Sequence, residues 1–147
     1  MGAYDSYNTK VGMAQGGDTQ FVKSGGTVDI EAGATVKYNG VNVTAYLDNT
    51  PETLIAAGAL ALGKRVSKLE LASGGAVTLA APDATCIGLV KVIEMSVDDG
   101  DVTLALTNVV GQSSGTTATF NDVRDQLVVI GGVDKWIVLK ERGISLA

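Results

Sequence analysis

GDTQFVKS-GGTVDIEA-GATVKY, residues 17–38, repeats with a period of eight residues and sets the expectation for the fold. Gly recurs at positions 17, 25 and 33, and a large apolar residue recurs at 22, 30 and 38. Because Gly takes a positive φ at little cost, each Gly supports a tight turn. The residues between the turns alternate between apolar and charged, as in Val28-Asp29-Ile30-Glu31. The stretch therefore predicts short β-strands joined by glycine turns.

The length of the repeat bears on how these strands are buried. Eight extended residues span at most roughly 26 Å, which is one short strand and a turn and too little for a full coil of a single-chain solenoid. We therefore expect several copies of the chain, most simply three, to wind these strands together. The alternative is a three-stranded meander packed on the rest of the same chain. The residues expected at a trimer interface are Val22, Val28, Ile30, Val36 and Tyr38.

Composition excludes several classes of protein. Of the 147 residues 46% are hydrophobic, which excludes a disordered chain, and the net charge of −5 argues against a nucleic-acid partner. The chain has no His, which removes the commonest general base and metal ligand. No signal peptide and no apolar run as long as the roughly 18 residues of a membrane span are recognised. We expect a protein made in the cytoplasm that binds neither nucleic acid nor membrane.

Four segments are predicted along the chain. Residues 1–16 form an N-terminal arm, either a flexible tail or an arm that orders on a partner. Residues 17–47 form the β-repeat module, with a hairpin turn at Asn39-Gly40. Residues 48–66 are predicted as a helical linker, because Thr50 is a good N-cap, Pro51 suits the first helical position and Gly63 is a good stop.

Residues 67–147 are predicted as a C-terminal antiparallel β-sandwich or jelly-roll-like domain, so the protein as a whole is mainly β with one short helix. Asp99-Gly100 predicts a hairpin between two of its strands, and Trp136 is expected in its core. The predicted strands are 68–71, 76–80, 88–97, 102–107, 116–120, 126–130, 136–140 and 144–146.

Three stretches have some features of a binding or catalytic site, but each favours a structural interpretation. Gly58 to Lys64 matches a phosphate-binding loop except that Arg65 stands where Ser or Thr is needed. The acidic turn 98–101 lacks the spacing of a calcium loop. Cys86 lies among apolar residues and is expected to be a buried small side chain. We therefore expect no enzyme activity, no cofactor and no metal.

Two stretches carry a resemblance to a known family. Tyr7-Asn8-Thr9-Lys10-Val11 and Ser24-Gly25-Gly26, with the Gly33-Ala34-Thr35 that follows, resemble head-fibre and head-decoration proteins of tailed bacteriophages. The run from Gly75-Ala76-Val77-Thr78-Leu79 to the C-terminus is similar to β-domains of phage structural proteins. The stretch from Thr50 to Gly63 departs from the family.

The resemblance implies a homotrimeric capsid-decoration protein on the exterior of the virion, assembled in the bacterial cytoplasm and bound to the lattice of the major capsid protein. The residues expected to dock on the capsid are Tyr4, Tyr7, Asn8 and Lys10. Two other functions stay open. One is a tail-fibre or baseplate component that binds host glycans, and the other is a small β-fold hydrolase with paired carboxylates.

Overall fold

The computed structural model describes residues 11–13, 20–22, 37–38, 41–42, 50–111 and 115–147. The chain divides into two compact units, Met1–Ala34 and Thr35–Ala147. In the first unit, β1 (Val11–Met13) pairs antiparallel with β2 (Gln20–Val22).

A second pair of short strands belongs to the second unit, where β3 (Lys37–Tyr38) pairs antiparallel with β4 (Val41–Asn42). Tyr38 lies opposite Val41, which is the pairing that the predicted hairpin requires. The turn residues Asn39 and Gly40 lie outside the described residues, as does most of the eight-residue repeat.

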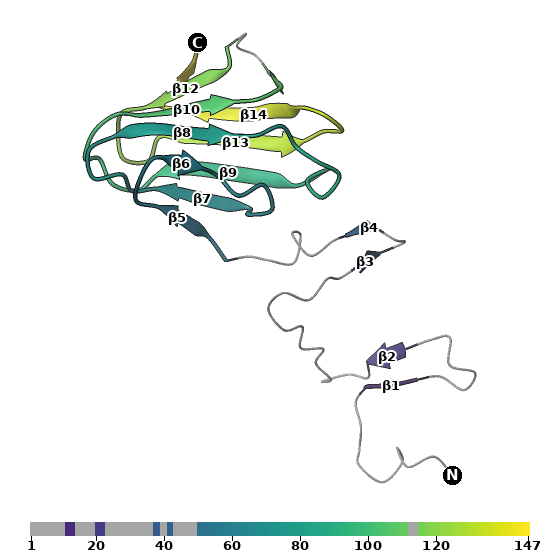
Figure 1. Cartoon of the computed structure of the whole chain (residues 1–147). Coiled ribbons are helices and arrows are strands. Elements are labelled where there is room, and N and C mark those ends of the chain that lie inside the picture. Colours follow the sequence, from purple (N-terminus) through teal and green to yellow (C-terminus); the bar gives the residue numbers. More distant parts are fainter. Residues whose placement is uncertain (1–10, 14–19, 23–36, 39–40, 43–49, 112–114) are drawn as a thin grey trace. The chain divides into compact units, whose positions relative to one another are not determined.

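The main body of the second unit is a sandwich of two β-sheets (Figure 1). One sheet has six strands in the order β11-β14-β13-β9-β7-β5, and the other has five in the order β15-β12-β10-β8-β6. The strands are β5 (Glu52–Leu54), β6 (Gly58–Ala59), β7 (Val66–Leu69), β8 (Gly75–Leu79), β9 (Val90–Met95), β10 (Val102–Leu106), β11 (Val109–Val110), β12 (Thr117–Phe120), β13 (Gln126–Gly131), β14 (Trp136–Arg142) and β15 (Ser145–Leu146).

Successive strands alternate between the two sheets from β5 to β13, so the chain winds around the core. Strands β5, β7 and β9 are consequently parallel neighbours in one sheet, and β6, β8 and β10 are parallel neighbours in the other. A parallel pair needs a crossover connection, and here each crossover is a strand of the opposite sheet. Strands β12 to β15 then add antiparallel pairs. Both sheets are therefore mixed, which corrects the predicted antiparallel sandwich.

The core lies between the sheets and follows the alternation of each strand. In β9 the buried positions are Lys91, Ile93 and Met95, and in β10 they are Val102, Leu104 and Leu106. Burying one such apolar side chain contributes about 1.5–3 kcal/mol. Trp136 is fully buried, as predicted, and its Nε1 donates a hydrogen bond to the Ala80 carbonyl at 2.8 Å, which ties β14 to the opposite sheet.

The predicted helix of the 48–66 linker is wrong, because the chain there forms β5 and β6 within the two sheets. Strand β5 pairs with β7, β6 pairs with β8, and Leu60 is only 4% exposed in the core. These tertiary contacts override a local helix preference that was itself weakened by Gly58, since a Gly inside a helix costs about 1 kcal/mol. Residues 52–60 thus contain the first strand of each of the two sheets, β5 and β6.

The predicted Asp99-Gly100 hairpin is also wrong, because β9 and β10 belong to opposite sheets. The loop between them instead packs on the loop before β8, where the Gly75 amide donates to the Asp101 carbonyl at 3.1 Å. A Cβ on Gly74 would lie 2.3 Å from that carbonyl oxygen, and Gly100 has a φ of 136°. Glycine is needed here for the close approach of two backbones.

Candidate functional site

The residues predicted for capsid docking, Tyr4, Tyr7, Asn8 and Lys10, lie outside the described residues. Of the residues predicted for the trimer interface, Val28, Ile30 and Val36 also lie outside them, while Val22 ends β2 and Tyr38 ends β3. Both sets therefore stay predictions.

The outer surface of the six-stranded sheet carries seven valine and isoleucine side chains. Val110 and Ile137 are 43% and 41% exposed, and the other members are partly buried at positions that alternate with core residues. None of them is among the partly buried residues that pack against the core. We call this surface the valine–isoleucine face, and its members are Val66, Val90, Val92, Val110, Val128, Ile130 and Ile137.

Strand register places these side chains in two adjoining rows. Val92 lies beside Val66 on one strand and Val128 on the next, and this row ends in the exposed Lys140 of β14. In the second row, Ile130 lies between Val90 and Ile137, which in turn lies beside Val110. A third row is polar and runs across the sheet in the order Lys68, Glu94, Gln126, Arg142. The surface thus has one row of valine and isoleucine, one row of valines that ends in Lys140, and one polar row.

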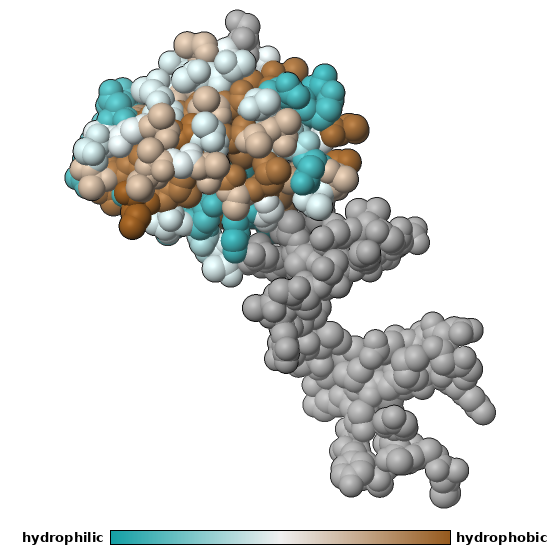
Figure 2. Space-filling model, viewed as in Figure 1, coloured by the Kyte–Doolittle hydropathy of each residue, from teal (hydrophilic) through white to brown (hydrophobic). Residues whose placement is uncertain are grey.

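The outer face of the five-stranded sheet has a different chemistry. Its paired positions are short and uncharged, with Thr103 beside Ala76 and Thr119, and Ala105 beside Thr78 and Thr117. Figure 2 shows brown, tan and pale residues intermingled on the visible side of the sandwich, with teal residues mostly toward its edges. The two faces of the sandwich therefore offer unequal amounts of apolar surface.

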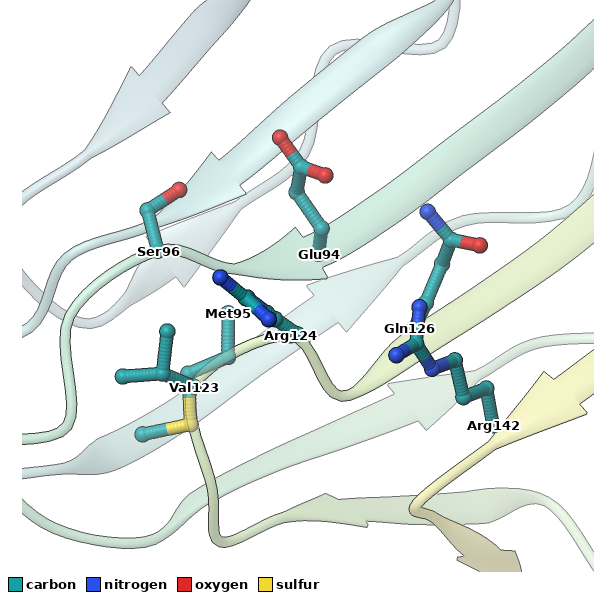
Figure 3. Close-up of a pocket in the computed structure, with 7 residues that line it drawn as sticks. All are labelled: Glu94, Met95, Ser96, Val123, Arg124, Gln126 and Arg142. Atoms are coloured by element: carbon teal, nitrogen blue, oxygen red, sulfur yellow. The ribbon is translucent and has the colours of Figure 1, made fainter.

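A pocket of about 280 Å³ opens at the charged end of the six-stranded sheet. Figure 3 shows Glu94 and Gln126 beside the guanidinium groups of Arg124 and Arg142, with Val123 to one side. Neither arginine has an ion-pair partner within the described part of the chain. Guanidinium and amide groups in this arrangement suit a carboxylate or a hydroxyl-rich ligand.

The backbone holds Arg124 at the mouth of this pocket in a left-handed conformation, with a φ of 76°. Its amide donates to the Met95 carbonyl at 2.9 Å, and the Met95 amide donates to the Asp125 carbonyl at 3.0 Å. These bonds hold a conformation that costs a residue other than glycine on the order of 1 kcal/mol.

A buried ion pair lies at the inner side of the same sheet. Lys91 is fully buried, and its Nζ donates to Glu52 Oε1 at 3.2 Å and to the carbonyls of Ala61 and Lys64 at 2.9 and 2.8 Å. Glu52 also accepts hydrogen bonds from the Ala61 amide and from the hydroxyl of Ser67. Burial lowers the pKa of Lys91, and the Glu52 carboxylate opposes that shift. The pair joins β5, β7, β9 and the turn after β6.

Cys86 is fully buried, as expected from the sequence. Its thiol lies 3.4 Å from Asp83 Oδ1 and 3.6 Å from the Leu62 carbonyl oxygen. Burial raises the pKa of the Cys86 thiol, whereas hydrogen bonds from Thr85 lower the pKa of Asp83. A protonated, buried thiol is a poor nucleophile.

Within residues 50–111 and 115–147, no group of three or more Asp, Glu or Cys side chains is placed to hold a metal ion. The described residues contain no helix with the length and apolar character needed to cross a membrane. No family model matches the sequence, and no curated protein matches it.

The valine–isoleucine face was not anticipated from the sequence, although a signal for it exists. Both Val90-Lys91-Val92-Ile93-Glu94-Met95 and Gln126-Leu127-Val128-Val129-Ile130 place apolar residues on both sides of a strand. Strands that are apolar on both sides are typical of a sheet covered on both faces. This pattern predicts a second covered surface in addition to the core.

Proposed function

We propose that this chain is a non-enzymatic structural protein of a tailed-bacteriophage virion, which trimerises and binds the outer surface of the capsid. The observation that carries the proposal is the valine–isoleucine face, since rows of valine and isoleucine on the outer surface of a sandwich suit a protein partner better than a small substrate. The glycine-turn repeat and the resemblance of its residues to head-decoration proteins support the same function.

The proposed mechanism is surface burial between subunits. The N-terminal arm, with Tyr4, Tyr7, Asn8 and Lys10, docks on the lattice of the major capsid protein, and the sandwich forms the outward body. Three arms on one trimer engage three neighbouring sites. Linked binding events of this kind can raise the overall affinity by about 10²–10⁴ over a single contact. Bridging of capsid subunits then raises the barrier to rupture of the shell.

Deletion of residues 1–10 tests the docking role of the arm. We expect the full chain to co-sediment with capsid shells assembled from the major capsid protein of the same phage. The truncated chain should remain in the supernatant, because it keeps the trimer but loses the docking residues.

The control is the native mass of the truncated chain, which should equal three chains. Co-sedimentation that is unchanged by the deletion would remove the docking assignment. Absence of binding by the full chain would remove the proposed function itself.

The pocket at Arg124 and Arg142 favours one alternative, a tail-fibre or baseplate component that binds acidic host glycans. Its two guanidinium groups can bind a sugar carboxylate, and Gln126 can bind hydroxyl groups. The described lining residues include no aromatic side chain on which a sugar ring could stack. Binding of a sialylated oligosaccharide that is lost in Arg142→Ala, together with failure to bind capsid shells, would favour this alternative.

A further inference from the structure

We infer that the pocket at Arg124 and Arg142 binds a single sugar acid, and that Glu94 makes it select a carboxylate over a phosphate ester. The inference adds a ligand-binding activity to the sandwich and does not depend on the proposed trimer or on docking to a capsid. It narrows the acidic glycan considered above to one sugar ring that carries one carboxylate.

The pocket has a volume that suits one sugar ring. It measures about 280 Å³, slightly less than the roughly 300–1,000 Å³ of pockets that enclose drug-sized ligands. Val123, which is 48% exposed, borders the polar lining and offers an apolar contact to the C–H groups of a sugar. A single ring therefore fits, whereas a longer oligosaccharide would extend beyond the pocket.

The polar side chains of the lining have no partners within the described ranges. Four of them make neither a hydrogen bond nor an ion pair there, namely Glu94, Arg124, Gln126 and Arg142. Ser96 also lines the pocket, and its hydroxyl oxygen is buried with no hydrogen-bond partner in the same part of the chain. Buried polar atoms nearly always have a partner, so we expect a group from outside the described residues to complete this site.

The backbone presents the polar groups from three neighbouring segments. Register places Gln126 between Glu94 and Arg142, and Arg124 precedes the same strand as Gln126. The positive φ of Arg124 is held by the hydrogen bond from its amide to the Met95 carbonyl. Strained backbone at a residue other than glycine is typical of ligand-binding sites.

The charges of the lining define the class of ligand. Two guanidinium groups and one carboxylate leave one net positive charge, which matches a single carboxylate. A guanidinium group binds a carboxylate through two parallel hydrogen bonds. Glu94 accepts hydrogen bonds from sugar hydroxyl groups, and the Gln126 amide both donates and accepts them. Glu94 also repels a phosphate ester, whose charge is about −1.5 to −2 at neutral pH.

Titration of the isotope-labelled full chain with methyl glucuronide, followed by NMR chemical shifts, tests the inference. Methyl glucoside is the uncharged control, because it has a CH₂OH group in place of the carboxylate, and acetate is the control for a carboxylate alone. We expect the glucuronide to shift the side-chain signals of Arg124, Gln126 and Arg142. It should bind several-fold more tightly than acetate, and the glucoside should cause no shift.

Substitution of each arginine locates the site. Arg124→Gln and Arg142→Gln should each weaken binding of the glucuronide by about tenfold or more, because each removes a charge-assisted contact. The control is Lys135→Gln, which removes the same charge from an exposed lysine just before β14, whereas Arg142 ends that strand. Screening over this distance should limit its effect to less than about twofold.

Replacement of Glu94 by Gln tests the selectivity. The unmodified chain should bind methyl glucuronide more tightly than glucose 6-phosphate. Glu94→Gln should strengthen binding of the phosphate more than binding of the glucuronide, because the removed charge repels the more highly charged ligand more strongly.

Each part of the inference has a result that would overturn it. Absence of shifts at tens of millimolar glucuronide would remove the site, and an equal loss in Lys135→Gln would show attraction by net charge alone. Equal affinity for acetate would remove the sugar assignment and indicate a bare carboxylate, as on an acidic peptide. Tighter binding of glucose 6-phosphate by the unmodified chain would remove the role of Glu94. The proposed function is tested separately, by the deletion of residues 1–10.

Discussion

Lys91 is a charged residue with no exposed surface, and its ammonium group is satisfied by three oxygen atoms, one from Glu52 and two from main-chain carbonyls. Ser67 and the Ala61 amide satisfy the Glu52 carboxylate in turn. A buried ion pair of this kind is stable only when each partner retains its hydrogen bonds. The cluster therefore fixes the positions of β5 and of the turn after β6 against β9.

Replacement of Lys91 by Ala should lower the free energy of unfolding by about 3–5 kcal/mol, because it empties a fully buried site and leaves the Glu52 carboxylate, whose side chain is only 15% exposed, without a cation. Urea denaturation followed by tryptophan fluorescence measures the loss, since Trp136 lies in the core. The control is Lys140→Ala, an exposed lysine of the same sheet, which should change the stability by less than about 0.5 kcal/mol. Equal effects of the two substitutions would contradict the assigned role of the buried pair.

Sequence reasoning located Trp136 and Cys86 in the core but did not locate Lys91. The strand Val90-Lys91-Val92-Ile93-Glu94-Met95 can place either alternate set of residues inward, since each set contains apolar and charged members. A shift of one residue exchanges the two faces of a strand. Only the neighbouring strands, and the oxygen atoms around Lys91, decide which set is buried.

At the scale of elements, the segment from β5 to Leu60 is part of the sandwich and not a linker. Leu60 is 4% exposed and its amide donates to the Thr78 carbonyl at 2.9 Å. Ile55, in the connection between β5 and β6, is 73% exposed. Two apolar residues of one short segment thus have opposite environments.

These environments predict unequal effects of truncation. Leu60→Ala should destabilise the protein by about 2–5 kcal/mol, because it removes a buried side chain and leaves a cavity. Ile55→Ala should change the stability by less than about 0.5 kcal/mol. Thermal unfolding of both variants checks the difference. A small effect for Leu60→Ala would mean that residues 50–63 are not part of the core.

The strand positions of the sandwich could be predicted from its alternating residues, but the order of the strands in the sheets could not. The eight strands predicted after residue 66 correspond to β7 to β10 and β12 to β15. Strands β5 and β6 were missed because residues 48–66 were predicted as a helical linker, and the two-residue β11 was not predicted. Turn signals such as Asp99-Gly100 mark a change of direction but do not indicate which sheet the next strand joins. The alternation of successive strands between the two sheets follows from the pairing of strands that are distant in the sequence.

At the scale of the whole molecule, one outer face of the sandwich carries valine and isoleucine beside a polar row, and the other carries threonine and alanine at its paired positions. The N-terminal arm is where the trimer is proposed to dock. The charged pocket lies at the polar row, so Arg142 belongs both to the pocket and to that row.

The most direct test of the account is the native mass of the full chain, measured by sedimentation equilibrium at micromolar concentration. The account predicts a mass of about 45 kDa, three times the 15.0 kDa of one chain. A mass of 15.0 kDa under the same conditions would contradict it, because the repeat would then be a local meander and not a module wound from three chains.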